Sequence, residues 1–206
     1  STLAGTLSSL IDTTAIAGTV YTYTCVAVTA AGDSSSSAAE TGYRALSAPT
    51  ALAASDGTST SGVVLTWTAA PGAVRYKVFR GVGAASTDIT PATPLITTNT
   101  FTDTTAVAGT IYTYAVKAVG PTGVADSAAS TVNTGWRGLP APTNLVATDN
   151  LTTMIKVTWN AVLGASSYQL RRQASDGLTK IETVTGTSFN DISAVAGITY
   201  TYSVQA

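Results

Sequence analysis

Residues 103–119 read DTTAVAGTIYTYAVKAV, and close copies of this stretch stand at residues 12–28 (DTTAIAGTVYTYTCVAV) and 191–206 (DISAVAGITYTYSVQA). The copies begin 91 and then 88 residues apart, so the repeated unit has the size of a domain. Apolar residues alternate with polar or small ones after the glycine of each copy, which is typical of a β-strand with one buried face. The sequence therefore predicts a tandem array of β-structured units.

The second copy belongs to a complete unit, which runs from about Ser47 to Leu139. No stretch of it keeps a helical period, and turn residues separate its predicted strands every 8–12 residues or so. Alternation in VVLTW places Leu65 and Trp67 on one face, as it does Val157 and Trp159 in the next unit. The predicted strands lie near 48–52, 63–67, 76–78, 101–103, 111–118 and 126–134. We call the strand near 111–118, which lies in the repeated stretch, and its copies in the other units the signature strand. Its inward residues are Tyr112, Tyr114, Val116 and Ala118.

These units resemble fibronectin type III repeats of the bacterial or phage extracellular type. The resemblance covers essentially the whole chain and rests on a Trp in the second strand, a Tyr in the third and a Gly-x-x-Tyr corner before the signature strand. The matching residues are Trp67 and Trp159, Tyr76 and Tyr168, and the pairs Gly18/Tyr21, Gly109/Tyr112 and Gly197/Tyr200. The resemblance implies an all-β protein of tandem seven-stranded antiparallel β-sandwiches with Greek-key connections.

The repeat divides the chain into three parts. Residues 1–46 are expected to be the C-terminal part of a first unit, 47–139 a complete second unit, and 140–206 a third unit without its last strand. The incomplete ends suggest a segment of a longer array. Strand donation between neighbouring chains is the alternative, although the first and third parts together hold more residues than one unit needs. We call the three parts the first, second and third repeat.

Composition excludes several function classes. Only 10% of the residues are charged and the formal net charge is −1, which argues against a nucleic-acid partner. The apolar runs are too short for membrane insertion. The chain has no His, the commonest general base and metal ligand, so we expect no catalytic site, no cofactor and no metal. A chain poor in charge and rich in Thr, with one Cys, suggests an extracellular protein, whether secreted, on a cell surface or in a virion.

Two pairs of residues stand where one repeat ends and the next begins: Tyr43 with Arg44, and Trp136 with Arg137. We expect the aromatic ring to pack at this joint and the nearby proline to stiffen it, which would give a semi-rigid rod. A patch of exposed aromatic residues that binds a ligand is the alternative.

Phe79 departs from the repeat, because Arg171 occupies the matching position. Alternation places Phe79 on the outward face of its strand. It is therefore the candidate for a contact surface, although a single exposed aromatic residue commonly has no function.

Three further features each have a structural and a functional interpretation. Asp12, Asp103 and Asp191 precede the signature strand and are expected to cap a turn, with calcium binding as the alternative. Cys25 aligns with Val116 and Val204, so we expect it in the core instead of exposed as a reactive thiol. The stretch 81–85 (GVGAA) is expected to form a hairpin turn and not a phosphate loop.

The sequence thus favours a non-catalytic structural or spacer array of an extracellular fibre, surface filament or adhesin, with a weak cell-surface or glycan contact as an additional role. The alternatives are accessory spacer modules of a secreted polysaccharide-degrading enzyme and a component of a phage tail or capsid fibre. The expected partners are the neighbouring repeats, identical chains in a fibre, or a cell-surface glycan or protein.

Overall fold

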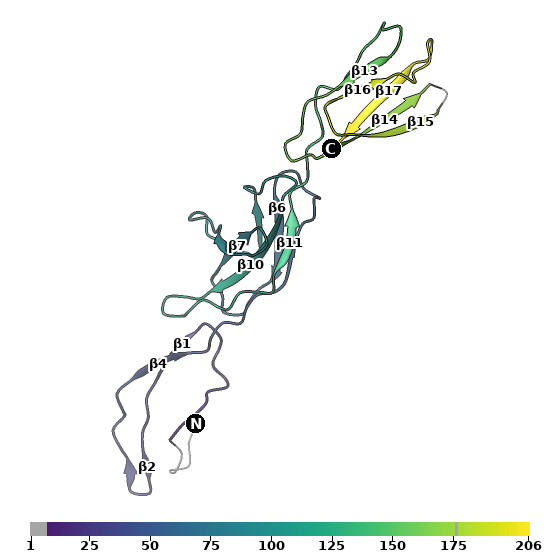
Figure 1. The fold of residues 1–206 in the computed structure, drawn as a ribbon. Coiled ribbons are helices and arrows are strands. Elements are labelled where there is room, and N and C mark those ends of the chain that lie inside the picture. The colour runs from purple at the N-terminus through teal and green to yellow at the C-terminus, as the bar shows by residue number, and fades with distance from the viewer. Residues whose placement is uncertain (1–7, 176) are drawn as a thin grey trace. The chain divides into compact units, whose positions relative to one another are not determined.

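The computed structural model describes residues 8–175 and 177–206, which form seventeen strands and no helix (Figure 1). The all-β prediction is confirmed. Within these described residues there is accordingly no helix that could cross a membrane.

Contacts between Cα atoms divide the chain into two compact units. Unit 1 comprises Ser1–Ala54, Leu65–Phe101 and Tyr112–Thr134, and unit 2 comprises Ser55–Val64, Thr102–Ile111 and Gly135–Ala206. Each unit thus contains the residues around one junction between repeats. These bounds differ from the repeat bounds, which stay a prediction. We keep the names of the three repeats for their residue ranges.

The first repeat contains two short antiparallel pairs. Strand β1 (Val20–Tyr23) pairs with β4 (Glu40–Tyr43), and β2 (Val28–Thr29) pairs with β3 (Gly32–Asp33). Cys25 lies between these pairs and is exposed, so the prediction that it belongs to a core is wrong. Strands β1–β4 are the strands described in this repeat, and none of them forms a second sheet that covers the thiol.

The second repeat contains seven strands in two sheets. One sheet has the order β5-β6-β9 and the other β11-β10-β7-β8. Its strand pairs β5–β6, β7–β8 and β7–β10 are antiparallel. Strand β5 lies at a sheet edge, a position that tolerates the proline directly before it, Pro49. The strands are β5 (Thr50–Ala54), β6 (Val63–Thr68), β7 (Arg75–Gly81), β8 (Thr87–Asp88), β9 (Thr100–Asp103), β10 (Ile111–Val119) and β11 (Asn133–Trp136).

Alternation along β6 builds the core of the second repeat. Val63, Leu65 and Trp67 are buried while their neighbours in the strand are exposed. The Trp67 ring meets the Tyr76 ring of β7 edge-on, with 5.1 Å between the centroids, so β6 and β7 face each other across the core. The predicted inward residues of the signature strand, which is β10, are also buried: Tyr112, Tyr114, Val116 and Ala118.

The third repeat uses the same two layers, with strand orders β12-β13-β16 and β15-β14-β17. Trp159 and Tyr168 repeat the edge-on contact at 5.5 Å, within a core that also contains Val157, Val162 and Leu170. Strand β17 lies at the edge of its sheet. The strands are β12 (Val146–Ala147), β13 (Ile155–Thr158), β14 (Tyr168–Ala174), β15 (Thr179–Val184), β16 (Ser188–Asp191) and β17 (Tyr200–Gln205).

The last strand of the second repeat begins later than predicted, at Asn133 and not near Asp126. In the stretch before β11, hydrogen bonds to serine side chains take the place of the regular backbone ladder. The Oγ atoms of Ser127 and Ser130 accept hydrogen bonds from the N–H groups of Ala118 and Val116, at 2.9 and 3.1 Å. The hairpin turn predicted at 81–85 is confirmed, because it joins β7 to β8.

Candidate functional site: the joints between repeats

At each joint, an arginine at the end of one repeat binds the loop before the signature strand of the same repeat. We call this loop, residues 15–18 or 106–109, the corner loop. The carbonyl of Arg137 accepts a hydrogen bond from the N–H of Gly109 at 2.9 Å. Its Nη1 donates to the carbonyl of Ala106 at 3.4 Å, and its Nε donates to the carbonyl of Thr60 at 2.6 Å. The guanidinium therefore ties two loops of the second repeat to the segment that leaves it.

Arg44 makes two of the same contacts in the first repeat. Its carbonyl accepts from the N–H of Gly18 at 2.9 Å, and its Nη1 donates to the carbonyl of Ala15 at 3.4 Å. The corner residues Ala15 and Gly18 correspond in the repeat to Ala106 and Gly109. One mechanism thus fixes the end of both repeats.

The two aromatic residues before these arginines contact different parts of the chain. The hydroxyl of Tyr43 accepts a hydrogen bond from the N–H of Ala125 at 3.2 Å, which connects the end of the first repeat to the second. Trp136 instead lies over Gly57 of its own repeat, where an added Cβ would stand 2.6 Å from the indole Nε1. Their assignment as joint residues stays a prediction, and the contacts give each one a separate role.

Sequence reasoning missed the residues that bring successive repeats together, which are two pairs of glycines. A Cβ atom on Gly18 would lie 2.7 Å from the carbonyl oxygen of Gly72, and one on Gly72 would lie 2.0 Å from the carbonyl oxygen of Ala17. Both glycines have positive φ angles, +75° and +82°. The two backbones therefore touch without intervening side chains, which a residue with a Cβ would prevent.

The second joint repeats this arrangement with Gly109 and Gly164. A Cβ on Gly164 would lie 2.5 Å from the carbonyl oxygen of Ala108, and the φ angles of the two glycines are +74° and +92°. A leucine closes each pair: Leu46 lies 2.9 Å from the Cβ position of Gly18, and Leu139 lies 3.2 Å from that of Gly164. We call each set of two glycines and one leucine a glycine seat.

A sequence signal for the glycine seats exists, although it does not show that their members meet. One glycine ends the Ala-Ile/Val-Ala-Gly corner, and the other follows Pro71 or Leu163 in a turn. The leucine stands two residues after the arginine in both joints. Each element recurs in register, but the contact between them forms only when the strands are folded.

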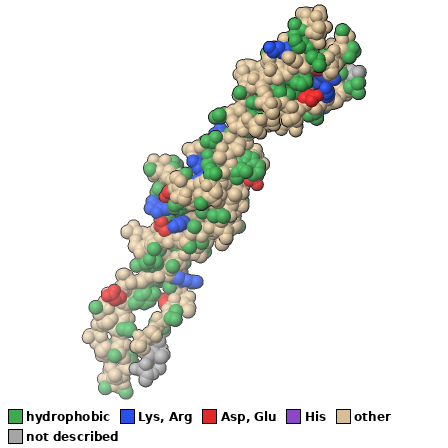
Figure 2. Space-filling view, viewed as in Figure 1, with side chains coloured by type: hydrophobic (Ala, Val, Ile, Leu, Met, Phe, Trp, Pro, Cys, Tyr) green, Lys and Arg blue, Asp and Glu red, His purple; other side chains and the backbone are tan. Residues whose placement is uncertain are grey.

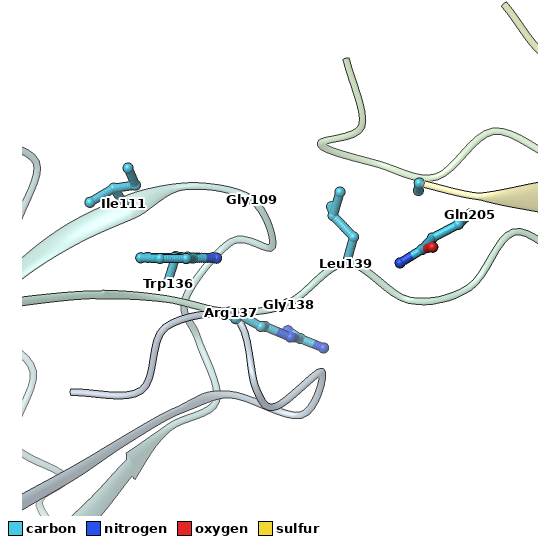
Figure 3. Close-up of a pocket in the computed structure, with 9 residues that line it drawn as sticks. Gly109, Ile111, Trp136, Arg137, Gly138, Leu139 and Gln205 are labelled. Carbon is cyan, nitrogen blue, oxygen red and sulfur yellow. The ribbon is translucent and has the colours of Figure 1, made fainter. Parts of the chain in front are cut away.

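A pocket of about 400 Å³ lies beside the second glycine seat (Figure 3). Figure 3 shows the Trp136 indole, the Leu139 side chain and the Gln205 amide around it. Its nine lining residues offer an aromatic ring, a guanidinium and an amide, but no carboxylate, imidazole or thiol. The pocket could hold a polar group by hydrogen bonds, but these residues provide no general base.

Phe79 lies on β7, where it is half-buried. Lys117 of the adjacent strand β10 places its Nζ 5.5 Å from the centre of the ring, so the cation covers part of the aromatic face. Its function as a contact surface stays a prediction.

The repeated aspartates cap turns, as predicted. Oδ1 of Asp12, Asp103 and Asp191 accepts a hydrogen bond from the N–H of the residue two positions later, at 2.9, 3.0 and 3.1 Å. The side-chain hydroxyl of that residue donates to the same oxygen in all three repeats. This is the geometry of an Asx turn.

Asp191 also belongs to a buried charge cluster. Arg172 donates to both carboxylate oxygens at 2.8 and 3.0 Å, and Tyr202 donates to Oδ2 at 2.7 Å. Burial by itself raises the pKa of Asp191, but the hydrogen bonds from Arg172, Tyr202 and Ser193 outweigh it and hold that pKa below the usual value. Burial and the bond to Asp191 raise the pKa of Tyr202. The cluster stabilises the corner before β17.

Charge is sparse elsewhere. Figure 2 shows few Lys, Arg, Asp and Glu side chains on the visible face, some of them in small groups of both signs, among hydrophobic and uncharged polar ones. In the part of the chain that the structure describes, no three His, Cys, Asp or Glu residues come together in a group that could hold a metal ion.

The sequence is similar to segments of several larger bacterial enzymes. It is 31% identical over 228 aligned positions to exoglucanase B of Cellulomonas fimi, which covers 98% of this chain and 20% of that protein. It is 34% identical over 168 positions to chitinase A1 of Niallia circulans, with 75% of this chain and 22% of the relative covered. A 73-residue match to the poly(3-hydroxybutyrate) depolymerase of Ralstonia pickettii is 41% identical and covers 35% of this chain and 14% of that enzyme. The chain thus spans about a fifth or less of each relative.

The fold has a solved counterpart in a two-domain fibronectin type III segment of chicken tenascin. The two share a TM-score of 0.57 at 22% sequence identity, over 76% of this chain and 89% of the tenascin segment. No protein-family model matches the chain.

Proposed function

Because the chain consists of tandem repeats with the fibronectin type III fold, we propose that it is a non-catalytic spacer within a secreted, extracellular polysaccharide-degrading enzyme. The observation that carries this proposal is the alignment with exoglucanase B, which takes in nearly the whole chain but only a fifth of the enzyme. A segment of that relative size leaves room in such a protein for a separate catalytic part.

The named relatives favour this spacer over a fibre, filament or adhesin. Exoglucanase, chitinase and depolymerase are all names of enzymes that act on polymers. An enzyme acting on an extended polymer benefits when its parts stand at a set distance, and each added repeat increases that distance.

The glycine seats supply the mechanism of the spacer. Backbone contacts at Gly18–Gly72 and Gly109–Gly164 have no rotatable side chain between them, and a leucine shields each one. A joint of this kind restricts bending more than a free linker does. A free linker samples many backbone conformations and would lose that conformational entropy if it became ordered. We infer semi-rigid joints from this packing.

Gly164→Ala tests the joint. The added Cβ meets the carbonyl of Ala108, so the contact must open, and we expect faster local motion and shifted amide signals at Ala108 and Gly109 in ¹⁵N NMR relaxation spectra. Gly177→Ala is the matched control: Gly177 also has a positive φ, +88°, but its Cβ position has no described atom within 4 Å. Both variants carry similar backbone strain, so only the first should disturb the joint.

Equal effects of the two substitutions would rule out a seat that depends on close approach. The non-catalytic part of the proposal is tested separately, by incubating the chain with cellulose and with chitin. We expect no release of soluble sugar above buffer alone, and turnover with saturation kinetics would contradict the proposal.

A further inference from the structure

One outward sheet face of the second repeat carries three cations, in a chain that is otherwise poor in charge. Strands β7 and β10 pair side by side (Figure 1), and the residues of β7 that alternate with buried Tyr76 and Val78 point away from the core. They include Arg75 and Lys77, and Lys117 of β10 lies directly opposite Lys77. The whole chain has ten Lys and Arg residues, so three on one face are a local concentration. We call Arg75, Lys77 and Lys117 and the surface between them the cationic face.

The fold does not require the two opposed lysines. At the matching positions of the third repeat stand Gln169 and Gln205, which lie opposite each other in the ladder between β14 and β17. Like charges directly opposite each other on antiparallel strands are destabilising, whereas two amides carry no charge to repel. The second repeat therefore contains a repulsion that the same sheet avoids in the third repeat. An anionic partner on the cationic face would offset that repulsion.

The nearby carboxylates leave two of the three cations without an ionic partner. Asp126 bonds to Lys77, with 2.7 Å between Oδ2 and Nζ. Asp88 of β8 lies farther along the sheet, about 13 Å from Arg75 when measured along β7. Within the described part of the chain, the guanidinium of Arg75 makes no hydrogen bond or ion pair, and the ammonium of Lys117 makes no ion pair. A net positive charge thus remains on this face.

A pocket of about 470 Å³ lies at the end of the cationic face, and Arg75 is one of the residues that line it. Val74 and Leu95 give the pocket an apolar wall, and they expose 51% and 46% of their surface. Thr97 and Thr122 add two hydroxyl groups. Every lining residue belongs to the second repeat, all of which the structure describes. The pocket therefore combines a cation, an apolar wall and neutral hydrogen-bonding groups.

A closed turn forms one side of this pocket. Gly123 has a φ of +88°, and the N–H of Val124 donates to the carbonyl of Pro121 at 3.1 Å, which is the hydrogen bond of a β-turn. The carboxylate of Asp126 also lines the pocket, but it is held by Lys77. Among the described lining residues, the guanidinium is therefore the charged group that stays free, and it favours an anion.

We propose that this pocket and the cationic face together bind an acidic polysaccharide, a chain of sugars that each carry a carboxylate. A planar carboxylate matches the fork of N–H donors on a guanidinium. The C–H face of a sugar ring fits against the apolar wall, and the sugar hydroxyls can bond to the two threonines. Successive carboxylates then meet Arg75 first and the lysine pair next. The proposal goes beyond the spacer function and does not depend on it.

The spacing of the cations favours a chain over a small acid. Arg75 and Lys77 stand two residues apart on one strand, which separates them by about 7 Å. The Cβ atoms of the two opposed lysines lie about 5 Å apart, as in other directly opposite pairs. A small acid can satisfy one of these cations, whereas a chain with a carboxylate on every sugar can reach all three. Neutral chains such as cellulose have no group that pairs with them.

The probe is oligogalacturonate, added to the ¹⁵N-labelled full chain at low ionic strength. We expect saturable shifts of the amide signals of Arg75, Lys77, Lys117 and residues 119–126. The same oligosaccharide with its carboxylates converted to methyl esters keeps the sugar and loses the charge, so it should bind about tenfold more weakly. Added salt should also weaken the binding of oligogalacturonate, because it screens exposed charges.

Arg75→Gln tests the pocket from the side of the protein. It removes the guanidinium and keeps a polar side chain, so binding should weaken about tenfold. The double variant Lys77→Gln, Lys117→Gln copies the third repeat and should also weaken binding. Lys156→Gln is the matched control, because it removes one charge from an exposed position of the third repeat and should leave binding unchanged. The indole signal of Trp67 reports whether the second repeat of each variant stays folded.

Several results would overturn the proposal: no saturable shifts with oligogalacturonate, equal binding of the methyl ester, or equal weakening by Arg75→Gln and Lys156→Gln. Equal affinity for inorganic polyphosphate would also overturn it, because that result would indicate a general anion surface without a place for a sugar. The spacer function would survive each of these results, since a spacer needs no acidic ligand.

Discussion

The signature stretch is exposed in the first repeat and buried in the second, although the two copies are nearly identical in sequence. Tyr23 exposes 40% of its surface, whereas its counterpart Tyr114 exposes none. Cys25 is exposed and its counterpart Val116 is fully buried. Strand β6 of the opposite sheet supplies covering side chains in the second repeat, among them Leu65 and Trp67. The comparison teaches that alternation marks which face of a strand can be buried, while a second sheet determines whether it is.

Replacing the central tyrosine gives the largest expected difference between the two repeats. Tyr114→Ala removes a fully buried ring and should lower the free energy of unfolding by about 3–5 kcal/mol, as for other large-to-small core substitutions. Tyr23→Ala should cost a small fraction of that, because the ring keeps much of its contact with water. Urea unfolding followed by far-ultraviolet circular dichroism measures both, and equal losses would show that the first repeat has a core of its own.

Removing the capping carboxylate gives the next largest difference, this time between the first and third repeats. Asp191→Ala leaves Arg172 without its partner and should cost about 3 kcal/mol, near the low end for one member of a buried ion pair because the Arg172 side chain is 18% exposed. Asp12 caps its turn without an arginine on its carboxylate, and Asp12→Ala should have a much smaller effect. The Trp159 indole signal in a urea titration reports on the third repeat.

The pH dependence of the third repeat sharpens this second comparison. The pKa of Asp191 is lower in the folded chain than in the unfolded one, so its stabilising contribution is complete above the ordinary aspartate pKa of about 3.9. That contribution is lost as the pH falls through the folded pKa. Asp191→Asn should remove this loss, so the variant and the wild type should converge in stability toward acid. A constant difference between them down to pH 2 would contradict the assignment.

The serine pairs give the smallest expected difference. Ser130→Ala leaves the buried N–H of Val116 without an acceptor and should cost about 1–3 kcal/mol. Ser37→Ala exposes the N–H of Cys25 to water, which replaces the lost bond, so the stability should hardly change. Amide hydrogen exchange at Val116 and Cys25 measures both, and strong protection of Cys25 in the wild type would contradict this explanation.

Much of the fold follows from local pattern. Alternation in VVLTW and IKVTW identified the buried residues Leu65, Trp67, Val157 and Trp159, because strand side chains alternate with a strict period of two. The late start of β11 could not be predicted, since it depends on serine hydroxyls that take over the ladder between 125 and 132. The exposure of Cys25 was missed for a different reason: alignment to Val116 transfers the side-chain direction but not the sheet that covers it.

At the joints, too, the sequence predicted one part of the arrangement and missed another. The sequence placed Tyr43, Arg44, Trp136 and Arg137 near the ends of repeats, because they precede the Ala-Pro-Thr start of the next one. It did not reveal the partners of these residues, which lie up to 82 positions away. The glycine seats depend on backbone approach between loops that are distant in sequence, and a glycine by itself looks the same in any turn.

The sequence by itself determined the repeat, the strand faces and the aspartate caps, because these depend on side-chain chemistry and on neighbours a few positions apart. Only the tertiary structure decided which copy of the signature strand is buried and which glycines touch. Those properties depend on what packs against a segment, and that packing brings together residues from distant parts of the chain.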